Sequence, residues 1–526
     1  MTKTTKTQFS LNTVRGIAFL LFLICAIYAI EVRAQSGGPF MDYTVTSLTT
    51  THYFHVQLQT GSWNQDTINF KMPKWTPGYY QLLNYGNAVE NVVAKDDNGI
   101  LSVRKMNDNT WSVTGTKNKK FTLSYDVKAE KQFVAQSYLD STRAYLVPAS
   151  VFLYADGYLN KPATIKIEPP KKWKIATGLD SANGMRNGFS APDFDILYDC
   201  PVLMGNLDEL PSFSVRGVEH RFIGYQVGSF DRAQFMQNLK KVVEASVAII
   251  GDVPYKRYTF IAIGPGRGGI EHLNNTTFSF NGNDLHSAEA MNRMMNFLAH
   301  EYFHHYNVKR IRPFELGPFD YDQGSRTNQL WVSEGLSVYY EYLIVKRAGL
   351  ANEQTLFNDF EKNINATENN PGRFYQSLTQ ASYKTWSDGP FGTQGEDAGK
   401  SISYYDKGPV IGLLLDFTIR HATQNKKSLD DVMRLLYWKY YKELQRGFTD
   451  AEFEQACETV AGTSLANFFD YVYTTKEIDY TTCLSYAGLR LERKDSDTGK
   501  VKKFAIRRLE KMDELQAAVL NSWLGN

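Results

Sequence analysis

The sequence predicts an α+β protein of several domains: an antiparallel, sandwich-like β domain first, an α-rich domain second, and a short α/β tail. Apolar and polar residues alternate in the first half, as at 54–58 and 121–127, which is the period of half-buried strands. After about residue 287 the apolar period lengthens to that of helices. The 526 residues are 43% hydrophobic and 22% charged, an ordinary globular composition with room for two to four domains.

The N-terminus has the layout of a secretory signal peptide. Positive charges precede an apolar run over 16–30, and a small-x-small sequence ends at Ala34. The apolar run is shorter than the roughly 20 residues that span a bilayer, so we expect cleavage after Ala34 rather than an anchor helix. The mature protein is therefore expected to be exported, periplasmic or secreted, and to have no stable membrane span.

The remaining chain divides into three expected segments, a β domain over 35–210, an α-rich domain over 211–475 and a short C-terminal segment over 476–526. Turn signals recur between short strands in the first of these, which favours an antiparallel sandwich. The second begins with a buried strand at 258–263. Its expected helices cover 287–308, 328–348, 407–421, 428–445 and 450–473. The tail is expected to hold strands near 489–491 and 504–506 and a helix over 512–524.

Charge and cysteine content exclude several classes of protein. Lysine and arginine total 58 against 56 acidic residues, so the net charge of +2 gives no reason to expect nucleic acid as a partner. Beyond the signal peptide, Cys200, Cys457 and Cys483 are too few and too scattered for a disulfide framework or a cysteine-based zinc site. A Cys457–Cys483 bridge and free, partly buried thiols are both compatible with export.

His300, Glu301 and His304 form an HExxH sequence inside an apolar-periodic stretch. On a helix, two histidines four residues apart share one face and can clamp one zinc ion. The alternative, a helix face that carries histidines by accident, would place three costly polar groups in an apolar helix for no return. Glu301 can take a proton from the attacking water and deliver it to the leaving amine. His305 points elsewhere and is expected to be structural.

A catalytic zinc takes three protein ligands, so a further acid or histidine should lie nearby. Glu334 is the favoured candidate, because apolar residues flank it and an antiparallel helix pair would bring it over the first helix. Glu341 is the competitor, since it lies seven residues on and shares the same helix face.

Two further segments carry groups that suit peptide chemistry. A glycine-rich run over 264–272 includes Gly268 and Gly269, which let a substrate backbone approach closely, and Glu271, whose carboxylate can hold a protonated amine. The segment 403–408 opens a helix with two tyrosines, and a hydroxyl there can donate to a developing oxyanion. The alternatives are a flexible loop with a solvated glutamate for the first segment and aromatic packing for the second.

Taken in order, these motifs resemble the glycyl aminopeptidase family of zinc metallopeptidases, relatives of thermolysin and aminopeptidase N. The resemblance covers about 40–490. The segments that carry it are 75–79 (WTPGY), 268–272 (GGIEH), 300–313 (HEYFHHYNVKRIRP), 331–335 (WVSEG) and 404–408 (YYDKG).

The resemblance implies a thermolysin-like catalytic domain after the β domain, with Glu334 rather than Glu341 as the third zinc ligand. It also implies that Glu271 holds the free amine of a peptide substrate and that Tyr405 stabilises the oxyanion. Members of the family favour small N-terminal residues, glycine or alanine.

Two departures from the family pattern stand out. The C-terminal segment is too short for the usual PDZ-like domain. Val338 stands where thermolysin has an aspartate that orients a zinc-bound histidine, so that support must come from elsewhere.

We therefore expect an exported zinc aminopeptidase that acts on peptides, with His300, His304 and Glu334 as ligands and Glu301 as base. Two rivals are an endopeptidase of the same fold and a non-catalytic envelope scaffold that binds partners through the β domain.

Overall fold

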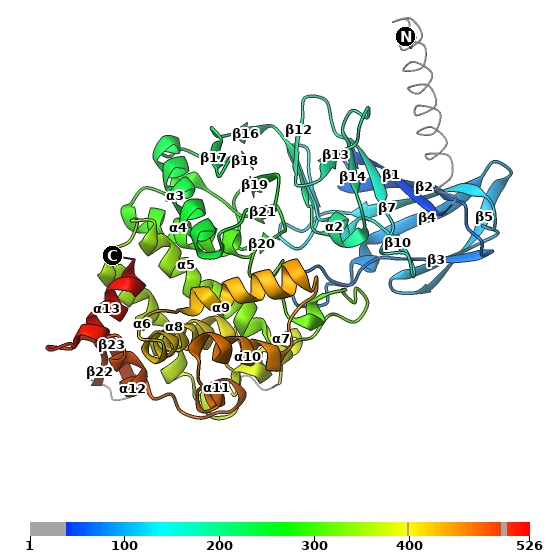
Figure 1. Cartoon of the computed structure of the whole chain (residues 1–526). Coiled ribbons are helices and arrows are strands. Elements are labelled where there is room, and N and C mark those ends of the chain that lie inside the picture. Colours follow the sequence, from blue (N-terminus) through cyan, green and yellow to red (C-terminus); the bar gives the residue numbers. More distant parts are fainter. Residues whose placement is uncertain (1–37, 397–398, 496–501, 526) are drawn as a thin grey trace, which may run out of the picture.

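A computed structural model describes residues 38–396, 399–495 and 502–525. The strands of the N-terminal part, blue to cyan in Figure 1, lie to one side of the helices, which run from green to red. The predicted α+β architecture is confirmed. The predicted signal peptide falls outside the described residues. Among the helices that the structure describes, none combines the length and apolar character needed to cross a bilayer.

The β domain is built on one large sheet in which alternate side chains point into the core. On strand β2, Phe54, Val56 and Leu58 are fully buried while their neighbours are more exposed, as the period of two predicts. Neighbouring strands are antiparallel except that β1 and β11 run parallel. In spatial order the strands are β10 (Tyr154–Ala155), β3 (Thr67–Lys71), β6 (Thr110–Thr114), β5 (Gly99–Asn107), β4 (Val89–Asp96), β7 (Lys120–Lys128), β2 (Tyr53–Gly61), β1 (Phe40–Leu48), β11 (Ala163–Glu168), β14 (Gly188–Ala191) and β13 (Asp180–Ser181).

A smaller antiparallel sheet and a short helix complete this domain. The helix, α2 (Phe194–Tyr198), is capped by Asp193, whose side chain accepts from the Ile196 N–H. The sheet consists of β12 (Lys174–Thr177), β15 (Val202–Gly205), β9 (Arg143–Leu146) and β8 (Tyr138–Leu139).

The second half begins with a mixed sheet. The predicted buried strand is confirmed as β19, which runs parallel to both of its neighbours, β18 and β21. Helix α3 (Arg232–Ile250), which the sequence analysis did not predict, precedes β19. The strands are β16 (Leu207–Glu209), β17 (Phe213–Val215), β18 (Val218–Tyr225), β19 (Arg257–Ala262), β20 (Gly269–Glu271) and β21 (Asn275–Phe278).

Helices make up most of the rest. The helices after α3 are α4 (Ala288–Phe303), α5 (Leu336–Arg347), α6 (Glu353–Asn369), α7 (Leu378–Asp388), α8 (Tyr404–Ala422), α9 (Leu429–Leu435), α10 (Asp450–Ala461), α11 (Ala466–Tyr473), α12 (Tyr480–Ser485) and α13 (Glu514–Leu524), with π-helical turns at Trp331–Gly335 and Leu436–Glu443. The sequence analysis missed α6, α7 and the short α12.

Two predicted helices end differently from the prediction. The helix expected over 287–308 stops at Phe303, and the Lys309 N–H bonds the carbonyl of His304 as the chain turns away. The helix expected over 450–473 is two helices, because Gly462 adopts a left-handed conformation (φ 69°) that ends α10.

The C-terminal tail forms the predicted strands, β22 (Leu489–Asp495) and β23 (Lys502–Arg508), and the predicted helix α13. It packs on the helical half: the Asn365 side chain exchanges two hydrogen bonds with the backbone of Phe504 (2.8 and 3.0 Å), and Trp523 is buried in the same core as α5 and α8. Cys457 and Cys483 are buried free thiols, as is Cys200, so the bridge considered above is not formed.

Candidate active site

Helix α4 positions the two histidines of the HExxH sequence. Ser287 caps the helix by accepting from the Ala290 N–H, and Glu289 lies in the first turn, where the helix dipole favours an acid. At the other end His300 and His304 share one face, and their Nε2 atoms lie 2.9 Å apart. Both side chains are buried.

Glu334 approaches this pair from the π-helical turn before α5. Its Oε2 lies 3.2 Å from Nε2 of His304 and 3.5 Å from Nε2 of His300. The turn lies close against α8, because a Cβ on Gly335 would be only 2.6 Å from the Cα of Gly408. Such π-turns recur at functional sites, since they rotate side chains relative to a regular helix.

The environment of these three side chains fits a divalent metal. Nδ1 of His300 lies 2.9 Å from a carboxylate oxygen and Nδ1 of His304 lies 2.8 Å from a backbone carbonyl, so each ring, when it is neutral as a metal ligand must be, carries its proton on Nδ1. Both Nε2 lone pairs then point toward each other and toward the carboxylate of Glu334. A cation among them satisfies all three donors, whose atoms lie within 4.8 Å of one another.

The groups behind the two histidines replace the aspartate that Val338 does not supply. Glu341 Oε2 lies 2.9 Å from Nδ1 of His300, and the Asn307 carbonyl lies 2.8 Å from Nδ1 of His304. Glu341, considered above as a third ligand, is thus placed on the far side of the His300 ring. Such partners fix the tautomer and orientation of a metal-binding histidine.

Glu301 lies beside the candidate metal ligands and against Gly269 of the glycine-rich segment. Burial raises the pKa of Glu301, the nearby histidines lower it, and the result is a pKa of about 7. The contact with Gly269 is close: a Cβ there would be 2.6 Å from the carboxyl carbon of Glu301. Glycine at 269 is therefore needed to leave room for this carboxylate. A side chain at Gly268 would instead face Val134, so the structure does not bring Gly268 against these residues.

Glu271 faces the same side of β20 as Gly269, because residues two apart on a strand share a face. It is 4% exposed, and its Oε1 accepts no hydrogen bond from the described residues. Gly78, from the WTPGY turn of the β domain, packs on it: a Cβ at Gly78 would lie 3.0 and 3.2 Å from the two carboxylate oxygens. Glu271 is therefore a buried carboxylate near the candidate metal ligands, with one oxygen that accepts no hydrogen bond from the described residues.

Tyr405 lies in the first turn of α8, where its N–H bonds the capping Ser403 side chain (3.1 Å). Its ring is centred 6.2 Å from that of His300. Burial, followed by the charge of Glu334, raises the pKa of Tyr405 well above its usual value, so the hydroxyl stays protonated. The neighbouring Tyr404 hydroxyl is instead paired with Thr385 (2.9 Å).

His300, His304 and Glu334 are placed to hold a metal, and the buried Glu301 lies beside them. Together with the fold, this arrangement defines a metallopeptidase. Family models match two parts of the chain: the Peptidase M61 N-terminal domain over 42–206 and M61 glycyl aminopeptidase over 293–411. The chain belongs to the M61 glycyl aminopeptidase family.

Solved structures with the same fold include two metallopeptidase relatives. An aminopeptidase N family protein from Idiomarina loihiensis superposes with a TM-score of 0.81 at 26% identity, covering 86% of this chain and 79% of that one. An M1 zinc metallopeptidase from Deinococcus radiodurans shares the fold, with a TM-score of 0.51 at 13% identity, covering 84% of this chain and 94% of that one. No curated protein matches the chain in sequence.

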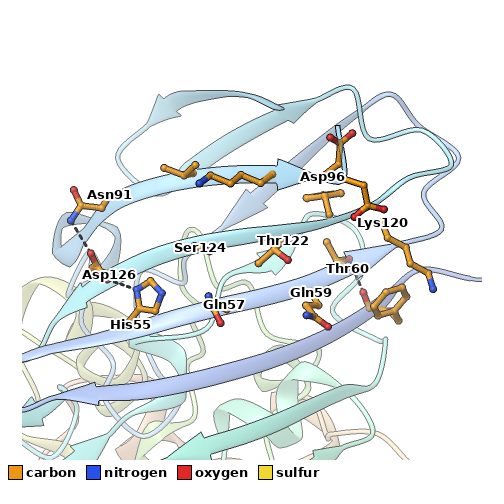
Figure 2. Close-up of a pocket in the computed structure, with 15 residues that line it drawn as sticks. His55, Gln57, Gln59, Thr60, Asn91, Asp96, Lys120, Thr122, Ser124 and Asp126 are labelled. Atoms are coloured by element: carbon orange, nitrogen blue, oxygen red, sulfur yellow. Dashed lines mark hydrogen bonds and ion pairs between the residues drawn. The ribbon is translucent and has the colours of Figure 1, made fainter. Parts of the chain in front are cut away.

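A separate hollow of about 730 Å³ lies on the β domain, over the outward face of β2, β4 and β7. Figure 2 shows that its lining is mainly polar, and that Asp126 bonds both His55 (2.7 Å) and Asn91 (2.8 Å). None of the predicted site residues lines it. Its polar groups partly satisfy one another, so it supplies no chemistry comparable to that beside α4.

Proposed function

We propose that this protein is a zinc aminopeptidase that releases small N-terminal residues, glycine or alanine, from peptides. The observation that carries the proposal is Glu271, a buried carboxylate with an unpartnered oxygen on the same side of β20 as the residue that touches Glu301. A buried carboxylate oxygen that accepts no hydrogen bond is costly, and the ammonium group of a peptide N-terminus can supply the missing hydrogen bond.

Zinc suits the proposed ligands His300, His304 and Glu334, because two imidazoles and one carboxylate are the ligand set of many catalytic zinc sites. When bound, it supplies a Lewis acid for the peptide carbonyl and favours ionisation of water.

The protein's own groups handle the proton and the charge. Glu301, a buried carboxylate beside the proposed ligands, can accept a proton from the attacking water and return it to the leaving amine. The protonated hydroxyl of Tyr405 can donate to the oxygen of the scissile carbonyl as negative charge develops there. Glu271 fixes the amine end, so that the first peptide bond is presented for cleavage.

The proposal is tested with glycine and alanine anilides beside their N-acetylated forms, with and without a zinc chelator. We expect chelator-sensitive cleavage of the free-amine substrates alone. Equal cleavage of both forms would make the protein an endopeptidase. No cleavage by zinc-loaded protein would favour the binding-scaffold alternative.

We also propose that the protein is exported, on the signal-peptide pattern that ends at Ala34. Fractionation of cells that express the full chain, with N-terminal sequencing of the product, tests this. Recovery of uncleaved chain in the cytoplasm would contradict it.

A further inference from the structure

Behind Glu271 lies a buried ion pair that the proposed reaction does not use. Nζ of Lys309 is 2.8 Å from Oδ1 of Asp199 and 4.0 Å from Oε1 of Glu271. The three side chains are only 8%, 9% and 6% exposed. Burying three charged groups costs desolvation free energy. Ion pairs and hydrogen bonds must offset that cost, or the arrangement must serve a function.

Asp199 connects the two halves of the molecule at this point. It follows α2 in the β domain, yet its carboxylate accepts from the Leu273 N–H (2.6 Å) and faces Nδ1 of His272 (3.2 Å) as well as Lys309. Leu273 and His272 directly follow Glu271 on the chain. Asp199 thus anchors both the backbone after Glu271 and the cation beside it.

The three side chains together carry one net negative charge, which one ammonium ion would neutralise. Asp199 and Lys309 form a close pair, so one negative charge, that of Glu271, is left over. At 4.0 Å the Lys309 ammonium is too far for a hydrogen bond to Glu271, and Oε1 stays available for a substrate amine. It is close enough to attract the carboxylate in a site of low dielectric constant. Gly78 confines the same carboxylate by packing against it.

We propose that Lys309, held by Asp199, is a positioning residue that fixes the carboxylate of Glu271 for binding the substrate's amine. The role rests on the proposed aminopeptidase function, since it has no meaning unless Glu271 binds that amine. It assigns the β domain a part in substrate recognition, because Asp199 and Gly78 both come from that domain. The alternative is an ion pair that only stabilises the fold.

The test compares Lys309→Met, Glu271→Gln and the double variant, using kcat and KM for a glycine anilide. We expect Lys309→Met to raise KM by about tenfold while kcat changes by less than about threefold, because it disturbs binding and not the reacting groups. In the Glu271→Gln background, Lys309→Met should add less than about twofold, since the carboxylate that it positions is gone.

Arg420→Met is the matched control, because Arg420 and Asp416 form a buried pair of similar separation (3.1 Å) elsewhere in the catalytic half. It should lower stability and leave KM unchanged. If Lys309→Met alone does not fold, Asp199→Asn with Lys309→Met removes both charges of the pair and should show the same rise in KM.

The outcomes separate the two proposals. A wild-type protein that cleaves N-acetylated and free substrates equally well refutes the amine-binding function and, with it, the positioning role. A wild-type protein that requires the free amine, with KM unaffected by loss of Lys309 or with fully additive effects in the double variant, overturns the positioning role alone.

Discussion

His304 and His305 are neighbours in the sequence and both are buried, but they face different regions of the molecule. His304 faces Glu334 and His300. Burial lowers the pKa of His304, yet the charge of Glu334 outweighs it and the net shift is upward. No carboxylate of the described residues pairs with His305, and burial together with the charge of Arg310 pushes its pKa well below the usual value. The rings packed around His305 are those of Tyr255, Tyr258, Tyr302 and Tyr306.

The difference shows that burial alone does not give a histidine the surroundings that a metal ligand needs. Carboxylates lie on the side of His300 and His304, here called the histidine–carboxylate side, and they would balance a cation. Tyrosine rings lie on the side of His305, here called the aromatic side, and they stabilise a neutral ring. Substitutions on the histidine–carboxylate side should therefore lower metal content and turnover. Substitutions on the aromatic side should instead change the stability of the protein.

The largest effect is expected from His304→Ala. Loss of one ligand should abolish stoichiometric zinc binding and lower kcat/KM at least about 1,000-fold, because the Lewis acid is lost. Elemental analysis of the dialysed protein and the anilide assay measure both. His305→Phe is the matched control and should keep zinc and most activity. Equal losses in the two variants would refute the contrast.

Glu301→Gln distinguishes the role of a general base from the role of a metal ligand on the histidine–carboxylate side. The amide cannot accept the proton, so kcat should fall by about 100- to 1,000-fold while zinc content stays at one per chain. If zinc is lost as well, Glu301 supports the metal and its assignment as base fails.

On the aromatic side, His220 packs against Tyr258 and Tyr302, two of the rings that surround His305. We expect this buried histidine to make the free energy of unfolding depend on pH. Burial lowers the pKa of His220 to about 4, against about 6.5 in an unfolded chain. Between these values the unfolded chain binds a proton that the native protein does not, so the free energy of unfolding falls as pH drops from 6.5 toward 4, by about 3 kcal/mol.

Denaturant titrations of the wild type and of His220→Asn across this pH range would measure that dependence, which the variant should lose in large part. His286→Asn, at an exposed position, should keep it. The groups that face His220 are the hydroxyl of Tyr255 and the rings of Phe213, Tyr258 and Tyr302, with the charge of Glu219 nearby.

The smallest effect is expected from Glu341→Gln. The neutral amide should hold the His300 ring less firmly, and zinc affinity should drop by about 10- to 100-fold with the ligands intact. Competition with a chelator of known affinity would detect the change. An unchanged affinity would show that Glu341 does not orient His300.

The sequence predicted those parts of the site whose geometry is local. His300 and His304 follow from helical spacing alone, and Glu271 follows Gly269 by the period of a strand. Glu334 was favoured from its apolar flanks and from the family resemblance. The position of Glu341 depends on how α4 and α5 pack, which no local pattern reports.

Long-range contacts and local breaks account for what was missed. Asp199 and Lys309 are 110 residues apart, so only the folded structure brings them together. Gly462 interrupts an apolar period that otherwise reads as one helix. Helices α6 and α7 were missed, although Asn352 and Ser377, which cap them by accepting backbone N–H groups, were visible start signals.

The contact between Gly335 and Gly408 limits how this enzyme can evolve. A methyl group at Gly335 would force the Glu334 turn and the first turns of α8, which carries Tyr405, apart. Selection for new substrates has little freedom at these two positions. Variation is better tolerated at the exposed Phe391, whose ring is centred 5.6 Å from that of Tyr405. Libraries that vary Phe391 should therefore retain more active clones than libraries that vary Gly335 or Gly408.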